Sequence, residues 1–262
     1  MGGNSYEFNF NFSQSLPIVP VLIGNGKTKT AFKCRGLIDT GGPRSCLHDE
    51  TAAKLALDVF DTNGIMEGRY GSNAIKKTAA DLLFDMNSQK FFLDRGHRFN
   101  VLDFNNCLFD AVLALPFLSL MRKFSIQGDS FKCEWVQNNK KSKPLKMDDI
   151  MMEMGVSIEN GEIKNTMIFP DTGASHSFFP FHMLQDAKVW GETPMNTPSG
   201  KHTIPWCETS LRLHKNNTSH VFENVQICVC PDDQPPAIGI DIIRKLKEFV
   251  IEDGKCELGF AD

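Results

Sequence analysis

Apolar residues alternate with polar ones, or run in short blocks, over most of the chain, and this pattern predicts strands. Residues 6–12 (YEFNFNF) place one Tyr and three Phe at every second position, which is typical of a strand buried on one face. Residues 17–24 and 30–39 are apolar segments separated by the turn NGK, so they predict a hairpin. Residues 154–159 and 163–171 repeat that arrangement around the turn NGE. The sequence therefore predicts a mainly β protein in which one hairpin occurs twice.

Three segments depart from the strand pattern and predict short helices. Each begins with a residue suited to a helix N-terminus, either an Asp at the cap or a Pro in the first turn. The segments are residues 49–57 with Asp49 as N-cap, residues 115–124 with Pro116 in the first turn, and residues 241–249 with Asp241 as N-cap.

An internal repeat relates the two halves of the chain. Three pairs of segments match in the same order, namely LIDTGG (37–42) with FPDTGA (169–174), VLALPFLSLMRKFSI (112–126) with AIGIDIIRKLKEFVI (237–251), and KCE (132–134) with KCE (255–257). Three matches in one order indicate a duplicated lobe. The polar and basic residues 137–146 predict the linker, so lobe one is residues 1–136 and lobe two is residues 147–262.

Composition and charge narrow the class of protein. The net charge of −4 lacks the concentrated basic face that nucleic-acid binding needs. No apolar stretch is long enough for a membrane-spanning helix, and the N-terminal residues lack the pattern of a signal peptide. We therefore expect an intracellular, cytoplasmic protein that binds neither nucleic acid nor membrane.

The eight cysteines contain no C-x-x-C pair, and we expect them to be reduced, buried thiols. A zinc site is the alternative, because Cys228 and Cys230 alternate on a predicted strand and Cys207 lies upstream. Structural zinc sites normally have closer paired spacing, so the prediction is that the protein binds no metal.

Two copies of Asp-Thr-Gly mark the candidate catalytic residues, Asp39 and Asp171, each at the end of an apolar strand. A single copy is an ordinary turn sequence, but two copies in a duplicated frame bring two carboxylates face to face. Two such carboxylates share one proton. The ionised member accepts a proton from water, and the protonated member donates to the scissile carbonyl. This chemistry hydrolyses a peptide bond without a cofactor.

The residues beside each Asp are expected to support the pair. Thr40 and Thr172 carry hydroxyls that can join the two loops, and Gly41 and Gly173 permit a tight turn and close approach of the substrate backbone.

These motifs resemble those of the aspartic proteases, and the retroviral type (retropepsins) more than the pepsin type. LIDTGG and FPDTGA resemble the active-site motif, and AIGIDII (237–243) resembles the second signature of the family. Its lobe-one equivalent has Ala114 where Gly is usual. Residues 37–57 are also similar to proteases of BEL/Pao-type retrotransposons. The resemblance implies a bilobal aspartic-protease fold, in which two retropepsin-like β-barrel lobes are related by a pseudo-two-fold axis within a monomer.

The resemblance also implies flaps, which are hairpins that close over the substrate, at residues 66–73 and 196–203. The flap residues expected to bind substrate are Tyr70, Gly71, Ser199 and Gly200. It further implies an interlobe sheet formed by residues 6–12, 131–136, 150–156 and 255–260.

The position after each Asp-Thr-Gly holds Gly42 or Ala174, where pepsin-type enzymes commonly have Ser or Thr. Without a hydroxyl to donate to the ionised aspartate, the pKa values of the pair should be higher. We therefore expect activity at mildly acidic to neutral pH.

The expected function is an aspartic endopeptidase that cleaves extended polypeptides bound by strand-like hydrogen bonds. The alternative is a retrotransposon-derived module that binds or scaffolds peptides without cleaving them. The presence of both Asp39 and Asp171 favours the protease, because a binding module needs neither carboxylate.

Overall fold

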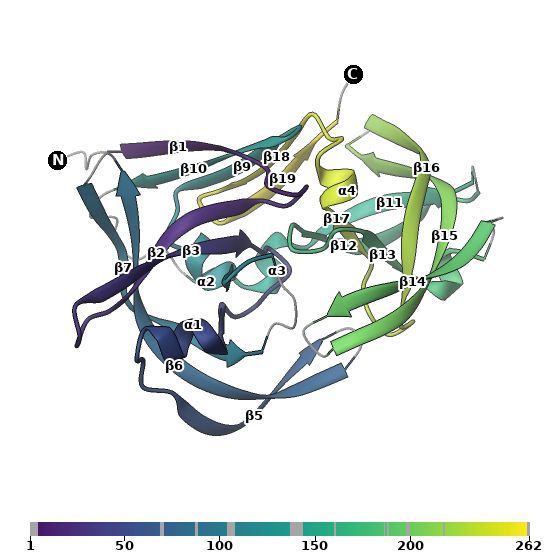
Figure 1. The fold of residues 1–262 in the computed structure, drawn as a ribbon. Coiled ribbons are helices and arrows are strands. Elements are labelled where there is room, and N and C mark those ends of the chain that lie inside the picture. The colour runs from purple at the N-terminus through teal and green to yellow at the C-terminus, as the bar shows by residue number, and fades with distance from the viewer. Residues whose placement is uncertain are drawn as a thin grey trace.

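The computed structural model describes residues 5–68, 71–86, 89–103, 108–136, 144–159, 161–185, 187, 189–197, 200–216 and 218–260. The structure is mainly β, with a few short helices, and it consists of two similar closed barrels (Figure 1). This confirms the predicted fold class. None of the described helices is long and apolar enough to cross a membrane.

The lobe-one barrel has six strands in the order β2-β3-β8-β4-β7-β6, and β6 closes it by pairing with β2. A seventh strand, β5, extends the sheet beyond β6. The strands are β2 (Ile18–Asn25), β3 (Thr30–Ile38), β4 (Cys46–His48), β5 (Phe60–Gly68), β6 (Gly71–Met86), β7 (Gln89–Leu102) and β8 (Ala111–Leu113).

The lobe-two barrel repeats this order as β11-β12-β17-β13-β16-β15, with β15 closing onto β11 and β14 extending beyond β15. The strands are β11 (Met152–Ile158), β12 (Lys164–Asp171), β13 (Ser177–Pro180), β14 (Val189–Thr197), β15 (Gly200–Lys215), β16 (Thr218–Cys230) and β17 (Ala237–Gly239). The strands of the two barrels lie on either side of the predicted linker, whose own boundaries stay a prediction.

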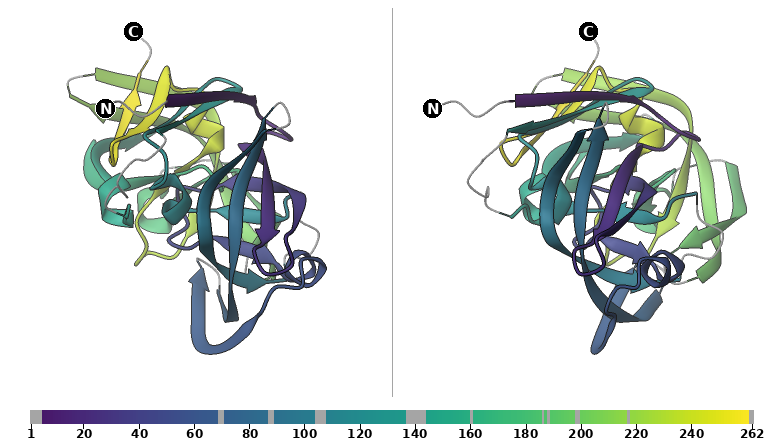
Figure 2. Two further views of the ribbon diagram at one scale, coloured as in Figure 1. Left: turned by 90° about the vertical axis from the view of Figure 1, so that its left-hand side faces the viewer. Right: turned by 60° about the vertical axis from the view of Figure 1, so that its left-hand side comes forward.

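A five-stranded interlobe sheet lies along one side of both barrels, at the top of Figure 1 and again in both views of Figure 2. Its order is β1 (Ser5–Asn11), β10 (Ser130–Val136), β9 (Lys123–Gln127), β18 (Glu248–Glu252) and β19 (Lys255–Gly259).

The central strands of this sheet, β9 and β18, carry the internal symmetry. Phe124 and Ile126 occupy the positions in the repeat that Phe249 and Ile251 occupy in lobe two. In the antiparallel pairing Phe124 faces Ile251 and Ile126 faces Phe249. Phe124 thus faces the lobe-two equivalent of Ile126, and Ile126 faces the lobe-two equivalent of Phe124. This reciprocal pairing places a pseudo-two-fold axis between β9 and β18.

The interlobe sheet differs from the prediction in its two central strands, β9 and β18, which were not expected in it, and in one expected strand that it lacks. Residues 150–156 were expected in it, but β11 pairs with β12 and β15 inside the lobe-two barrel. The reason is that β11 is buried on both faces, apart from Glu153, which suits a strand that closes a barrel. The short helix α3 (Met147–Ile150) packs against β19 instead.

The predicted helices exist but are shorter than expected. They are α1 (Asp49–Lys54), α2 (Leu115–Leu118) and α4 (Ile240–Ile243), and a 3-10 helix η1 (Phe181–Met183) also occurs. The expected C-terminal parts of the second and third helices instead lead into β9 and β18. Pairing in the interlobe sheet buries the aromatic and β-branched residues there, and this tertiary contact outweighs local helix propensity.

The predicted Asp caps are wrong. His48 is the N-cap of α1, where its Nδ1 accepts from the backbone N–H of Glu50 at 3.2 Å. Gly239 is the N-cap of α4, so Asp241 lies inside the first turn of that helix.

One continuous core of buried side chains joins both lobes to the interlobe sheet. Phe8 of β1 and Phe84 of β6 pack against Trp135 of β10, with ring centroids 5.3 and 4.9 Å from the indole. Tyr6, Phe10 and Phe12 are partly buried against the same core, which confirms the predicted apolar face of residues 6–12. The sheet is therefore held to the lobe-one barrel by aromatic packing.

Candidate active site

Asp39 and Asp171 lie at the ends of equivalent strands. Asp39 follows β3 and donates its backbone N–H to Leu113 of β8 at 3.1 Å. Asp171 is the last residue of β12 and is opposite Gly239 of β17. Both side chains are half-buried. The parallel pairings β3–β8 and β12–β17 thus fix the two carboxylates at the point where the lobes meet.

Each glycine of the Asp-Thr-Gly motifs lies against the aspartate of the other lobe. A Cβ atom on Gly41 would be 2.4 Å from the Cγ of Asp171, and one on Gly173 would be 2.6 Å from the Cγ of Asp39. Any side chain at either position would occupy the space of the opposite carboxylate. The glycines therefore allow the two loops to cross, and the structure brings the predicted pair together.

The two threonines connect the loops by a reciprocal set of hydrogen bonds. Thr40 Oγ1 donates to the carbonyl of Pro170 at 2.7 Å and accepts from the N–H of Thr172 at 3.0 Å. Thr172 Oγ1 donates to the carbonyl of Ile38 at 2.8 Å and accepts from the N–H of Thr40 at 3.1 Å. Both threonines are completely buried. Both hydroxyls and both threonine N–H groups have partners in the other loop, so the loops are fixed relative to each other.

Backbone donors orient each carboxylate within its own loop. The N–H of Gly41 donates to Asp39 Oδ1 at 2.8 Å. The N–H groups of Gly173 and Ala174 both donate to Asp171 Oδ1 at 3.1 Å.

The pKa of Asp39 lies well above its ordinary value. Burial is the largest cause, followed by the charge of Asp171 and the hydrogen bond to it, whereas the N–H groups of Gly41 and Gly42 oppose the shift. The direction is the one expected from the sequence, but the causes are burial and the second carboxylate rather than a missing hydroxyl. A pair of this kind retains a proton to higher pH than an isolated aspartate.

Both predicted flaps fall at the tips of hairpins. Gly68 of β5 pairs with Gly71 of β6, and Thr197 of β14 pairs with Gly200 of β15. Gly71 and Gly200 are the first residues of β6 and β15. Tyr70 and Ser199 lie outside the described residues, so their role in substrate binding stays a prediction.

Sequence reasoning missed a serine in each loop, six residues after the aspartate. Ser45 Oγ accepts from the N–H of Ala114 at 3.2 Å, and Ser177 Oγ accepts from the N–H of Gly239 at 3.0 Å. Ser177 Oγ also donates to Asp241 Oδ1 at 2.9 Å. The matching position of the two serines in the repeat was the available signal.

The alternative of a zinc site at Cys207, Cys228 and Cys230 gains no support, because among the described residues these three cysteines do not bring their sulfur atoms within 4.8 Å of one another. None of the seven described cysteines forms a disulfide. Burial, with a smaller contribution from Asp39, raises the pKa of Cys46 to about 12, which leaves this thiol protonated beside the aspartates.

One group among the described residues could hold a metal ion. His48, Asp49 and Asp103 place one ligand atom each within 4.8 Å of one another. Both aspartates are exposed, and His48 already caps α1. His48 ends β4 and Asp49 begins α1, so the group does not belong to the paired Asp-Thr-Gly loops.

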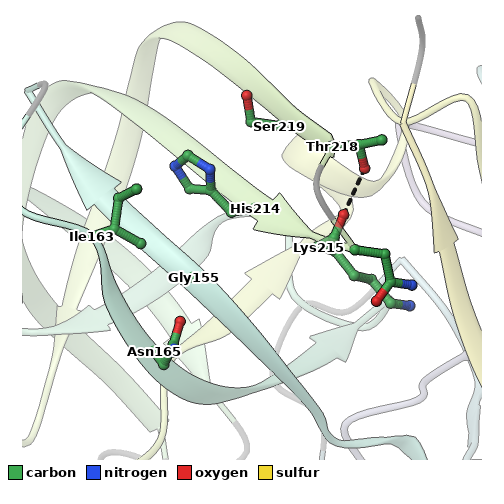
Figure 3. A pocket seen from close by; sticks show the side chains of 8 residues that line it. Gly155, Ile163, Asn165, His214, Lys215, Thr218 and Ser219 are labelled. Atoms are coloured by element: carbon green, nitrogen blue, oxygen red, sulfur yellow. Dashed lines mark hydrogen bonds between the residues drawn. The ribbon is translucent and has the colours of Figure 1, made fainter.

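A hollow of about 320 Å³ lies on lobe two, lined by residues of β11, β12 and the β15–β16 hairpin (Figure 3). Its lining includes His214, Lys215 and Ser219, and it contains neither aspartate. We therefore place the candidate active site at the crossed loops rather than at this hollow.

No protein-family model matches the chain, and neither does any curated protein. Two closed six-strand lobes in a mainly β structure fit a bilobal aspartic-protease-like fold.

Proposed function

We propose that the protein is an aspartic endopeptidase of the retropepsin-like type, with Asp39 and Asp171 as its catalytic pair. The observation that carries the proposal is the crossing of the two loops, in which each glycine lies against the opposite carboxylate and the two threonines are hydrogen-bonded reciprocally. The similarity of residues 37–57 to BEL/Pao-type proteases adds a retrotransposon origin to this proposal.

In the proposed reaction the pair shares one proton. The ionised aspartate removes a proton from a water molecule, whose oxygen attacks the scissile carbonyl carbon. The protonated aspartate donates its proton to the carbonyl oxygen and stabilises the tetrahedral intermediate. The intermediate collapses when the C–N bond breaks and the leaving nitrogen takes a proton from the pair. The raised pKa of Asp39 supports this assignment, because it keeps one proton available.

The substrate is an extended polypeptide that lies between the pair and the two hairpins. β5 and β14 are the last strands in their sheets, so each has an edge available for main-chain hydrogen bonds. Ile65 and Phe60 of β5 are 65% and 61% exposed, which provides apolar contact area for substrate side chains. The chain supplies both aspartates, so the active form is a monomer that needs no cofactor.

The test is incubation of the purified protein with a diverse peptide mixture from pH 3 to pH 8, beside Asp39→Asn and Asp171→Asn. We expect cleavage at mildly acidic to neutral pH and a loss of at least about a hundredfold in both variants. Asp232→Asn is the matched control, because this exposed aspartate pairs with His182 on the surface of lobe two.

Cleavage that survives in either dyad variant would rule out the shared mechanism. If the unaltered protein cuts no peptide at any pH, the non-catalytic peptide-binding module becomes the better interpretation, and binding of the same peptides would then be measured.

A further inference from the structure

A chain of three polar side chains, two of them buried, ends at the loop that carries Asp39. Asp94 Oδ2 lies 3.0 Å from His97 Nδ1, and His97 Nε2 lies 3.0 Å from Ser45 Oγ. The imidazole is 3% exposed, and the Asp94 side chain is 24% exposed. All three residues belong to lobe one, on β7 and on the loop between Asp39 and β4.

This order of atoms is that of a Ser-His-Asp triad, but Ser45 is not placed to attack a substrate. Ser45 is completely buried, and its Oγ already accepts the N–H of Ala114. The chain of hydrogen bonds therefore helps to fix the position of the loop between Asp39 and β4.

The loop is fastened to the turn between β8 and α2 at two points. Ser45 Oγ accepts from the N–H of Ala114, and the carbonyl of Gly42 accepts from the N–H of Leu115 at 3.1 Å. The N–H of Gly42 in turn interacts with the carboxylate of Asp39. A change at Ser45 is thus transmitted to Asp39 through the turn and Gly42.

The hydrogen bonds have one consistent direction when His97 is neutral. Nδ1–H donates to Asp94, and Nε2 accepts the hydroxyl proton of Ser45, which leaves the Ser45 oxygen to accept from Ala114. In the imidazolium form Nε2–H must donate to the same oxygen, and the hydroxyl proton of Ser45 loses its acceptor. Protonation therefore reverses the hydrogen bond between His97 and Ser45 and leaves the buried hydroxyl hydrogen of Ser45 without an acceptor, which destabilises the position of Ser45 in the loop.

The surroundings of His97 favour the neutral form. Burial lowers the pKa of His97, and Asp94 opposes that shift. From β6 the residue opposite is Ala80, and the ring of Phe99 packs edge-on with its centroid 4.9 Å away. Within the described residues, Asp94 is the charged group that acts on the imidazole.

We propose that His97 is a positioning residue for Asp39, and that it holds the lobe-one catalytic loop through Ser45 only while its imidazole is neutral. The proposal rests on the proposed function, since cleavage depends on His97 only if Asp39 is catalytic. It predicts that protonation of His97 adds to the loss of activity in acid that protonation of the ionised aspartate already causes.

The first test compares kcat and KM over pH 3 to 8 for the unaltered protein, His97→Gln and Ser45→Ala. A glutamine keeps an acceptor for Ser45 but does not titrate, so kcat at pH 7 should stay within about twofold while the acid limb moves to lower pH. Ser45→Ala should lower kcat about tenfold at every pH with KM little changed, because the loop is misplaced. His182→Gln, at an exposed ion pair, is the control and should match the unaltered protein.

A second test does not require turnover. In protein labelled with 13C at the aspartate carboxyl, the Asp39 signal (assigned with Asp39→Asn) should show an additional titration step at the pKa of His97, and this step should vanish in His97→Gln. Superimposable pH profiles and unchanged Asp39 titration in His97→Gln would overturn the proposal. Absence of cleavage with the linked titration step intact would overturn the proposed function alone.

Discussion

The loops that carry Asp39 and Asp171 have the same backbone connections but different side chains behind them. In lobe one the hydroxyl of Ser45 faces the imidazole of His97, and in lobe two the hydroxyl of Ser177 donates to the carboxylate of Asp241. The equivalent position to Asp241 in lobe one is Pro116, which offers no acceptor. Both lobes have the serine hydroxyl and the backbone N–H that donates to it. They differ in the titratable side chain beside the hydroxyl, which is His97 in lobe one and Asp241 in lobe two.

This difference makes the two loops unequal in their response to acid. Burial raises the pKa of Asp241 and lowers that of His97. A protonated carboxyl group still has a carbonyl oxygen that accepts from Ser177, but an imidazolium has no acceptor left for Ser45. Lobe one is therefore the acid-sensitive half of a symmetric site.

A second difference concerns a single methyl group beside each aspartate. Lobe one has Gly42 and Ala114, and the equivalent residues of lobe two are Ala174 and Gly239. A Cβ on Gly42 would be 3.0 Å from the Cβ of Ala114. Each lobe thus has one methyl group between these two equivalent positions, on opposite members of the pair. Lobe one accommodates the methyl group of Ala114 because position 42 has no side chain.

The largest expected effect on the free energy of unfolding concerns the threonine hydrogen bonds, in which the two lobes are most alike. Thr40→Val and Thr172→Val each leave a buried carbonyl and a buried N–H without a partner, so each should lower the free energy of unfolding by about 3 kcal/mol. Urea denaturation measures this, with Thr28→Val at an exposed hydroxyl as the control. Clearly unequal losses would contradict the reciprocal arrangement.

An intermediate effect is expected at the methyl pair. Gly42→Ala should lower the free energy of unfolding by about 2 kcal/mol, because the new Cβ would lie 2.8 Å from Asp39 Oδ2 as well as against Ala114. Adding Ala114→Gly should restore part of the loss, since it removes one of the two contacts. A double-mutant cycle measures the coupling. Strictly additive losses would show that the two positions are independent.

The smallest effect concerns the charge of Asp39. A carboxyl group whose pKa is raised in the folded state stabilises the protein fully below the unfolded pKa, near 3.8, and loses that contribution as pH rises through the folded pKa. Asp39→Asn should therefore raise the free energy of unfolding by about 1 kcal/mol at pH 7, with a smaller gain toward pH 4.

Thermal melts from pH 4 to 7 measure this difference. Asp232→Asn is a control of opposite sign, because His182 lowers the pKa of Asp232 in the folded state. A lower melting temperature for Asp39→Asn at pH 7 would mean that the ionised carboxylate stabilises the fold.

The short-range features of the site could be predicted from the sequence. Asp39, Thr40 and Gly41 are adjacent, and the repeat identified their partners without any knowledge of the fold. His97 could not be found in this way, because it is 52 residues from Ser45 and no local pattern connects them. The contact depends on the parallel pairing of β4 with β7, which only the closed barrel produces.

The helix ends were wrong for a related reason. The apolar residues around Phe124 and Phe249 satisfy a helical period as well as a strand period over so short a stretch. Their pairing across the pseudo-two-fold axis decides for the strand, and that pairing joins segments that are 125 residues apart in the chain. A sequence pattern describes the residues within one strand or helix, but it does not identify the strand that pairs with them.

β9 and β18 pair through equivalent residues of the repeat. This pairing, rather than the covalent link between the halves, aligns the two lobes. A chain interrupted between residues 136 and 144 leaves one barrel on each fragment, and each fragment then exposes the strand edge that the other covers. Under the proposed function, two such fragments would form a split protease whose activity reports their association. The same edge would let two copies of one fragment pair as a symmetric homodimer.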